Sequence, residues 1–229
     1  MDSKFIEWLA KDGCEKVGGA QYCVMLHALA NSCRAKSVLE FGLGWGYSGV
    51  AFCSSMAQRG GGRLVSVDAN VSALTPDLAN YATQCGVKWN VISKHSGEFT
   101  SMDSYDLIYT DIDPSAADNE SVFRSFYDNL RPGGLFIYDG FGGYPTISVL
   151  VASLTKKGYI FTPLMYNENY GHAVHRRPDG KEDVYRAMTM RCRRCDWKES
   201  GPYLDIFIPA VEHSRVAKHF VESVSSGGQ

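Results

Sequence analysis

The chain has 229 residues, of which 45% are hydrophobic and 21% charged, so it holds enough apolar material for one globular domain. A formal net charge of −2 argues against a surface committed as a whole to nucleic acid or to an anionic membrane. No stretch approaches the roughly 18 apolar residues of a membrane span, and seven cysteines, an odd number, suit buried thiols in a reducing compartment. We therefore expect a cytoplasmic protein with no membrane partner.

Periodicity along the chain predicts two helices first, at about residues 3–11 and 20–33, which would cap a sheet. Strands and helices then alternate: strands are expected at 38–40, 63–68, 89–93, 105–111 and 134–139, and helices at 47–58, 75–85, 119–130 and 145–156. This alternation predicts an α/β fold with a doubly wound, mostly parallel sheet.

The pattern changes after about residue 158. Three further strands are expected, at 159–165, 183–191 and 203–208, with no long helix between them, and they predict antiparallel pairing. We interpret residues 1–229 as a single domain of seven-stranded type: capping helices at 1–34, a βα core at 35–158 and an antiparallel extension at 159–222.

The segment Val38-Leu-Glu-Phe-Gly-Leu-Gly-Trp-Gly-Tyr-Ser48 predicts a buried strand that runs into a glycine-rich turn and then a helix. With no side chains at Gly42, Gly44 and Gly46, a ligand can approach the backbone N–H groups of the turn. A dinucleotide site would need a different glycine spacing, and Glu40 would repel a pyrophosphate. An anionic Glu40 suits a ligand with an ammonium group instead.

Acidic residues also end the following strands. Because the carboxyl ends of parallel strands meet at one edge of a sheet, we expect convergence there of Glu40, Asp68, Asp111 and Asp139. Asp68 ends the strand after the glycine turn, where an acid can accept hydrogen bonds from both ribose hydroxyls.

These residues resemble motif I of class I S-adenosylmethionine methyltransferases, and the Gly-Tyr-Ser ending is similar to that of the catechol and caffeoyl-coenzyme A O-methyltransferases. The resemblance covers about residues 17–160. It implies an S-adenosylmethionine site in which Glu40 and Gly42 line the methionine moiety, Ser48 holds its carboxylate, Asp68 holds the ribose and His95 and Ser96 border the adenine. Gly44 and Gly46 would shape the turn, Trp45 or Tyr47 would place a ring near the sulfonium, and Asp111 is a further candidate cofactor-binding residue.

In the resembling family, the residues at Asp111 and Asp139 bind Mg²⁺ together with an asparagine after the second acid. Here that position is Gly140, and the family's catalytic lysine is matched by Pro114, so metal dependence stays open. The stretch from Asp139 to Pro145 also looks like that of the metal-dependent macrocin-type sugar O-methyltransferases. Asp113 is a candidate replacement ligand, and His172 or His175 a candidate base that folds over the site.

Two other features lie toward the C-terminus. His172-Ala-Val-His175 and Cys192-Arg-Arg-Cys195 could form two knuckles around one structural Zn²⁺, although a solvated loop with two thiols is the simpler interpretation. Between His172 and Lys198, eight basic residues stand against four acidic ones, which would suit an anionic acceptor or an ordinary solvated surface.

The sequence thus predicts S-adenosylmethionine-dependent methyl transfer to a hydroxyl of a small-molecule acceptor, with Asp111, Asp139 and His172 as catalytic candidates. One alternative is an RNA-modifying methyltransferase that uses the basic C-terminal run. Another is a cofactor-binding interaction protein without catalysis. The resemblance also suggests a homodimer.

Overall fold

A computed structural model of the chain describes residues 5–6, 20–71, 76–112, 115–141, 144–165, 171–178, 187–191 and 205–209. Its backbone divides into two compact units, Met1–Gly180 and Lys181–Gln229. The second unit holds a separate antiparallel pair of strands, β8 (Ala187–Arg191) and β9 (Asp205–Pro209). The expected single domain stays a prediction.

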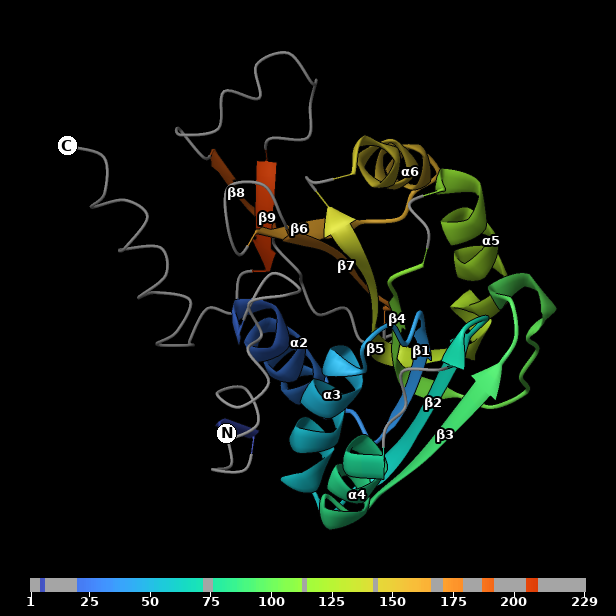
Figure 1. The fold of residues 1–229 in the computed structure, drawn as a ribbon. Helices are drawn as coiled ribbons and strands as arrows, with labels where there is room; N and C mark the ends of the chain where they lie inside the picture. Colours follow the sequence, from blue (N-terminus) through green and yellow to red (C-terminus); the bar gives the residue numbers. More distant parts are fainter. Residues whose placement is uncertain are drawn as a thin grey trace. The chain divides into compact units, whose positions relative to one another are not determined.

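The first unit is built on a seven-stranded sheet in the order β3-β2-β1-β4-β5-β7-β6 (Figure 1). The first five strands along the chain run parallel, and β7 is antiparallel to both β5 and β6. The predicted fold is confirmed. The strands are β1 (Ser37–Phe41), β2 (Gly62–Asp68), β3 (Val87–Ser93), β4 (Tyr105–Thr110), β5 (Leu130–Phe141), β6 (Phe161–Met165) and β7 (Gly171–Arg176).

Helices cover both faces of this sheet (Figure 1). Strand side chains alternate between the two faces, so in β4 Leu107 and Tyr109 join the core under one group of helices while Ile108 joins the other. The first group is α2 (Ala20–Ser32), α3 (Tyr47–Ala57) and α4 (Pro76–Gln84), and the second is α5 (Ala116–Phe126) and α6 (Pro145–Lys156). Short 3₁₀ helices lie at η3 (Ser96–Glu98) and η4 (Tyr127–Asn129). Among the helices described, none is long and apolar enough to cross a membrane.

Strand β7 was not predicted from the sequence. This strand lies between β5 and β6, whereas two of the three C-terminal strands that were predicted form the separate β8–β9 sheet. The segment Gly171-His-Ala-Val-His-Arg176 has only two aliphatic side chains, and so its apolar content is too low to mark a strand. The structure nevertheless buries its first five residues, because β5 and β6 pair with it on either side.

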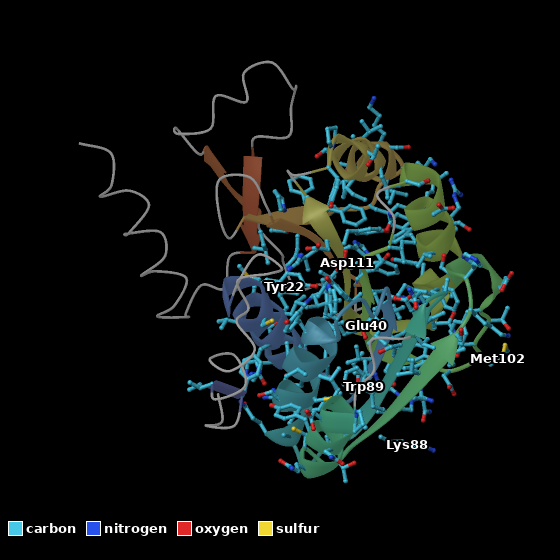
Figure 2. The ribbon with its side chains drawn as sticks, viewed as in Figure 1. Tyr22, Glu40, Lys88, Trp89, Met102 and Asp111 are labelled. Atoms are coloured by element: carbon cyan, nitrogen blue, oxygen red, sulfur yellow. The ribbon has the colours of Figure 1, made fainter. Side chains whose placement is uncertain are left out.

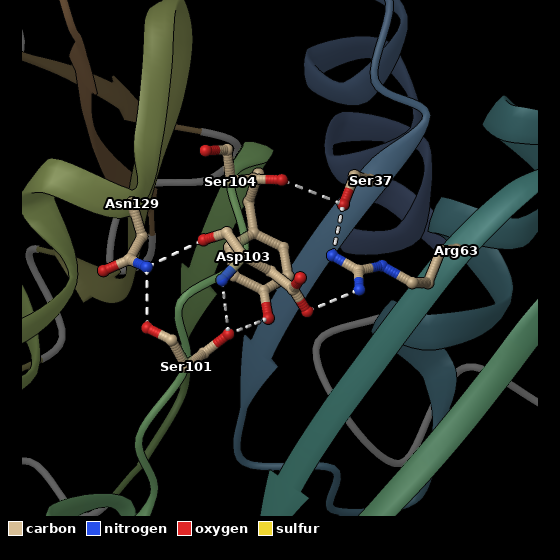
Figure 3. Close-up of polar contacts among 7 residues, drawn as sticks. Ser37, Arg63, Ser101, Asp103, Ser104 and Asn129 are labelled. Atoms are coloured by element: carbon tan, nitrogen blue, oxygen red, sulfur yellow. Dashed lines mark hydrogen bonds and ion pairs between the residues drawn. The ribbon is translucent and has the colours of Figure 1, made fainter.

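Polar contacts join the beginnings of several strands (Figure 3). The Arg63 guanidinium donates to Asp103 at 2.6 Å and to the Ser37 hydroxyl at 3.2 Å. The Asn129 side chain donates to the carbonyl oxygens of Ser101 at 2.9 Å and Asp103 at 2.7 Å. The Arg63–Asp103 pair is partly exposed, so we expect it to contribute at most about 1 kcal/mol and mainly to fix the loop before β4.

At the opposite ends of the strands, the turn after β1 passes very close to the end of β4. Gly42 has φ of +90°, and a Cβ built on it would lie 2.0 Å from the carbonyl oxygen of Asp111. Only glycine fits this approach without moving the two strand ends apart. Gly44 also has a positive φ, but no described atom lies within 4 Å of a Cβ built on it.

We predict that Gly42→Ala destabilises the protein by about 3 kcal/mol or more, since it adds a backbone clash to an unfavourable φ. Gly44→Ala is the matched control. It should lower the free energy of unfolding by about 1–2 kcal/mol, because the backbone φ is unfavourable for alanine there but no clash is added. Urea denaturation of both variants measures the difference. Equal losses would mean that β1 and β4 can separate without cost.

Candidate functional site

The carboxylate of Asp68 holds the glycine-rich turn in place. Its Oδ2 accepts hydrogen bonds from the backbone N–H groups of Leu43 at 2.7 Å and Gly44 at 3.2 Å. Its Oδ1 accepts from the N–H of Asn70 at 2.7 Å. A carboxylate oxygen has more than one acceptor direction, so Asp68 can hold the turn and still accept from a ligand.

Helix α3 begins directly after this turn. Gly46 is its N-cap, with φ of +80°, and has no side chain with which to cap the helix. The N–H of Val50 makes the first helical bond, to the Gly46 carbonyl at 3.0 Å. The N–H groups of the first turn therefore provide the positive end of a helix dipole next to Gly44 and Gly46, which suits a carboxylate.

Glu40 lies under the turn and is fully buried. Its two carboxylate oxygens accept hydrogen bonds from the hydroxyls of Ser48 and Ser66, and the Trp89 indole N–H donates to Ser66 at 2.8 Å. Burial raises the pKa of Glu40 to about 7, although both serine hydroxyls act in the opposite direction. Because the Ser48 hydroxyl donates to Glu40, a ligand carboxylate would contact the backbone of Ser48 and not its hydroxyl.

Asp111 follows β4 and is labelled close to Glu40 and Tyr22 in the view of Figure 2. The hydroxyls of Tyr22 and Tyr109 are hydrogen-bonded to each other, and each lies 3.4 Å from Oδ2 of Asp111. The hydroxyl that accepts in the bond between the two tyrosines is the one whose proton is available to Asp111. Solvent reaches part of the Asp111 residue, but the protein surrounds its carboxyl. Desolvation, followed by the charges of Asp139 and Glu40, raises the pKa of Asp111 to about 8.

Tyr22 and Tyr109 were not predicted as site residues. Tyr22 has the helical spacing of an ordinary core residue in α2, and Tyr109 is one of several apolar positions in β4. Both side chains are buried, and burial is the largest cause of their raised pKa, so both remain neutral hydrogen-bond donors at ordinary pH. Nothing in the sequence pattern marks this pair.

His172 lies in strand β7 and is fully buried, which differs from the expectation that it would fold over the site from a loop. Its Nδ1 is 2.9 Å from Oδ1 of Asp139, which faces it across the β5–β7 pair. The imidazole also packs against the rings of Tyr22 and Tyr109, with centroids 5.5 and 6.2 Å away. Its place behind Asp139 suits a role in positioning that carboxylate.

His175 faces the other side of the sheet, because residues three apart in a strand point in opposite directions. Its ring lies among Phe123, Tyr127, Tyr159 and Phe161, and its Nδ1 donates to the Ile160 carbonyl at 3.0 Å. Burial lowers the pKa of this imidazole, which favours the neutral form.

The zinc site proposed from His172, His175, Cys192 and Cys195 is therefore wrong in that form. The two imidazoles lie on opposite faces of β7 and cannot share one ion. Cys192 and Cys195 lie outside the described residues.

The described residues do not fit the magnesium site of the resembling family either. Gly140 occupies the asparagine position with φ of +78°, and a Cβ built there would lie 2.1 Å from Cδ2 of the Tyr144 ring. No side chain can therefore extend from position 140 as a third ligand. Within the described part of the chain, no three His, Cys, Asp or Glu side chains gather as a metal site requires. Asp113 and Pro114 lie outside that part.

The remaining predicted cofactor residues lie around the same strand ends. His95 is exposed and begins the η3 turn after β3, with Ser96 half-buried beside it. The N–H of Lys94 donates to the Asp68 carbonyl at 3.1 Å, which keeps this turn next to the end of β2. Trp45 is 70% exposed, whereas Tyr47 is partly buried against the core, so Trp45 is the ring available to a ligand.

Comparison with known families agrees with this geometry. Residues 39–141, which run from β1 to the end of β5, match a family model described as a methyltransferase domain. No curated protein matches the chain. Together with the fold, the family match confirms the expectation of a class I, S-adenosylmethionine-dependent methyltransferase.

Solved structures with similar folds include the O-methyltransferase TomG of Streptomyces achromogenes, in complex with S-adenosylmethionine. It is 17% identical, the alignment covers 78% of this chain and 91% of TomG, and the TM-score is 0.56. An O-methyltransferase of Bacillus cereus in complex with S-adenosylhomocysteine is 16% identical over 77% of this chain and 90% of its own, with a TM-score of 0.55. The methyltransferase PaMTH1 of Podospora anserina, bound to the same product, is 14% identical over 78% and 89%, with a TM-score of 0.56.

The raised pKa of Glu40 gives a testable pH dependence. Folded protein keeps the Glu40 proton up to a pH of about 7, whereas the unfolded chain releases it at about pH 4.5. The folded state therefore loses stability as the pH rises from about 4.5 through about 7. Glu40→Gln removes this term, which is on the order of 3 kcal/mol, so its free energy of unfolding should fall less than that of the wild type between pH 5 and pH 8.

Urea denaturation at both pH values measures this difference, and Glu98→Gln, at an exposed position in η3, is the control. Asp111 changes the wild-type curve in the same direction, and the charge of Glu40 is one cause of its raised pKa. Glu40→Gln removes that cause too, so the change at Asp111 adds to the expected difference between the variant and the wild type. Parallel pH curves for the wild type and Glu40→Gln would contradict the assignment.

Proposed function

We propose that the protein transfers the methyl group of S-adenosylmethionine to a hydroxyl of a small-molecule acceptor. The observation that carries this proposal is the close backbone approach of Gly42 to Asp111, an acidic residue that solvent reaches, beside the turn that we assign to the cofactor. The names of the Streptomyces and Bacillus enzymes, both O-methyltransferases, support oxygen as the acceptor atom.

In this proposal the turn from Gly42 to Gly46 and the first turn of α3 receive the methionine part of the cofactor. The N–H groups of α3 would meet the cofactor's carboxylate, and Asp68 would accept from its ribose hydroxyls. His95 and Ser96 would border the adenine, and Trp45 would lie near the sulfonium. The positive sulfonium would also offset the acidic character of the site around Glu40 and Asp111.

The acceptor hydroxyl would lie against Asp111. Its oxygen attacks the methyl carbon as the bond from carbon to sulfur breaks, which leaves S-adenosylhomocysteine, and the hydroxyl proton passes to the Asp111 carboxylate. Asp139 would orient the acceptor, and His172 would hold Asp139 from behind at 2.9 Å. Methyl transfer depends chiefly on such positioning, because alignment of the two reactants supplies much of the rate.

No step in this mechanism passes through a metal ion. The arrangement at Gly140 and Tyr144 argues against a third side-chain ligand at that position, and His172 engages one oxygen of Asp139. We therefore predict that enzyme purified from metal-free buffer and assayed with EDTA keeps its full rate of methyl transfer. A loss of rate that Mg²⁺ restores would contradict this prediction.

S-adenosylmethionine at 100 times its Kd should stabilise the wild-type protein by about 2.7 kcal/mol, or raise Tm by about 5–10 °C. Asp68→Asn keeps an oxygen that can accept from Leu43 and Gly44 but weakens the ribose contact, so we expect a much smaller shift. Asp128→Asn, at a side chain that is 94% exposed, is the control and should keep the full shift. An equal shift in all three proteins would rule out the ribose assignment.

We expect Asp111→Asn to lower kcat by about 10²–10⁴, because the amide cannot accept the hydroxyl proton, while the cofactor still raises Tm. His172→Gln should lower kcat less, since it acts only through Asp139. His175→Gln, on the opposite face of the same strand, should change stability and leave kcat nearly unchanged. Full kcat in Asp111→Asn, measured with an identified acceptor, would overturn the assignment of the base.

The other two functions from the sequence stay as alternatives. Most of the basic residues between His172 and Lys198 lie outside the described residues, and no described contact favours RNA as the acceptor. Cofactor binding without turnover across a broad panel of hydroxyl acceptors would favour the non-catalytic alternative.

A further inference from the structure

Trp89 lies in β3, two strands away from β1 and its turn, on the face of the sheet that α3 and α4 cover (Figure 2). Its side chain is partly buried and packs against the core on that face. Two contacts join it to the candidate site: the indole N–H donates to Ser66, and the ring lies against Gly49 in the first turn of α3. Trp89 was not among the site residues predicted from the sequence.

The indole N–H begins a chain of hydrogen bonds that crosses three strands. Nε1 of Trp89 donates to Oγ of Ser66 at 2.8 Å, and the Ser66 hydroxyl donates to Oε2 of Glu40. The other oxygen of Glu40 accepts from the Ser48 hydroxyl at the start of α3. A hydroxyl has one proton to donate, so the indole fills an acceptor direction of Ser66 and leaves that proton for Glu40. The chain therefore links β3 through β2 and β1 to the first turn of α3.

The inner members of this chain are buried. The exposed fraction is 0% for Glu40 and Ser66 and 4% for Ser48. A buried oxygen that loses its donor is left without a hydrogen bond, which costs more than the same loss at the surface. Loss of one donor should therefore shift the side chains that remain, including that of Ser48.

The second contact is steric. A Cβ built on Gly49 would lie 2.3 Å from Cζ2 and 2.4 Å from Cη2 of Trp89, so the first turn of α3 lies directly against the outer part of the indole. The backbone of Gly49 does not have a positive φ, and alanine is the better helix former at such a position. The close approach of Trp89 is what requires glycine here.

We propose that Trp89 is a positioning residue for the amino-acid end of the cofactor, a role that rests on the proposed function. There the N–H groups in the first turn of α3 meet the carboxylate of S-adenosylmethionine. Trp89 supports that turn directly at Gly49. It also fixes Ser48 through the hydrogen bonds of Ser66 and Glu40. Hydrogen bonds weaken steeply when donor and acceptor lose their alignment, so a shift of this turn weakens binding of the carboxylate.

The two ends of the cofactor should respond differently to a change at Trp89. In the proposed function, Asp68 holds the ribose and His95 borders the adenine, whereas the amino-acid end meets α3. The compound 5′-methylthioadenosine carries the adenosine and the sulfur but lacks the amino-acid end, and S-adenosylhomocysteine carries both. The difference between their affinities therefore measures the contribution of the first turn of α3.

Calorimetric titration of the full chain with both ligands, at constant pH, tests the proposal. Trp89→Phe keeps an aromatic ring but removes the N–H and the outer ring atoms. We expect S-adenosylhomocysteine to bind about fivefold or more weakly, as the loss of one buried hydrogen bond implies, and 5′-methylthioadenosine to stay within about twofold of the wild type. Should Trp89→Phe fail to fold, Ser66→Ala interrupts the same chain and should give the same selective loss.

Tyr105→Phe is the matched control. It also removes one hydrogen-bonding group from an aromatic side chain in a strand, here the Tyr105 hydroxyl, which lies 2.9 Å from Oγ of Ser101. Tyr105 begins β4, at the edge of the sheet opposite to the glycine turn. Both ligands should therefore bind to this variant within about twofold of their affinity for the wild type.

Gly49→Ala tests the steric contact by itself. The added methyl group should displace the first turn of α3, so S-adenosylhomocysteine should again lose about fivefold or more in affinity and 5′-methylthioadenosine little. Phenylalanine lacks the Cζ2 and Cη2 atoms that this methyl group would meet. Adding Gly49→Ala to Trp89→Phe should therefore cost less affinity than adding it to the wild type. Strictly additive losses would contradict the proposed contact.

Equal weakening of both ligands by Trp89→Phe would overturn the proposal, because it would indicate a general effect on packing. Unchanged binding of both ligands would overturn it as well. A wild-type protein that binds neither ligand would overturn the cofactor assignment, and the role of Trp89 with it. Binding of S-adenosylhomocysteine without methyl transfer to any hydroxyl would count against the proposed reaction alone, and the comparison of the two ligands would still decide the role of Trp89.

Discussion

The backbone contact between Gly42 and Asp111 sets the geometry of the proposed methyltransferase site. Gly42 donates to the Val67 carbonyl at 2.9 Å, and Asp111 donates to the Phe41 carbonyl at 2.8 Å, so sheet hydrogen bonds join the ends of β1, β2 and β4. The cofactor turn and the acid proposed as the base are held together by the main chain itself. Neither can shift without breaking the sheet at its carboxyl edge, which gives the site a fixed geometry before any ligand binds.

Burial of polar groups is the second constraint on this site. Glu40 lies beneath the turn with only serine hydroxyls as partners, and Asp111 has two tyrosine hydroxyls and a neighbouring acid, Asp139. Such an arrangement disfavours negative charge, as the raised pKa values of Glu40 and Asp111 indicate. A cationic ligand would relieve the repulsion, which is consistent with the proposed sulfonium cofactor and does not require a metal ion.

The two edges of the sheet thus differ in charge. Acidic side chains lie where the parallel strands end, and Arg34, Arg131 and Arg176 lie toward the edge where they begin. The strand register fixes the distance between the two edges.

The sequence by itself determined the glycine turn, the acids at the strand ends and the alternation of strands and helices, because local periodicity and backbone requirements encode these features. The tertiary structure decided the place of β7, where Gly171–Arg176 has too little apolar content to announce a strand and is buried only because β5 and β6 pair with it. That strand places His172 behind Asp139 and His175 in the core on the other face of the sheet. The two imidazoles therefore cannot bind one zinc ion as predicted. Tyr22 and Gly140 likewise acquire their roles only in the folded structure. The hydroxyl of Tyr22 meets Asp111, which is distant in the chain, and the ring of Tyr144 folds back over Gly140. No spacing in the sequence specifies either contact.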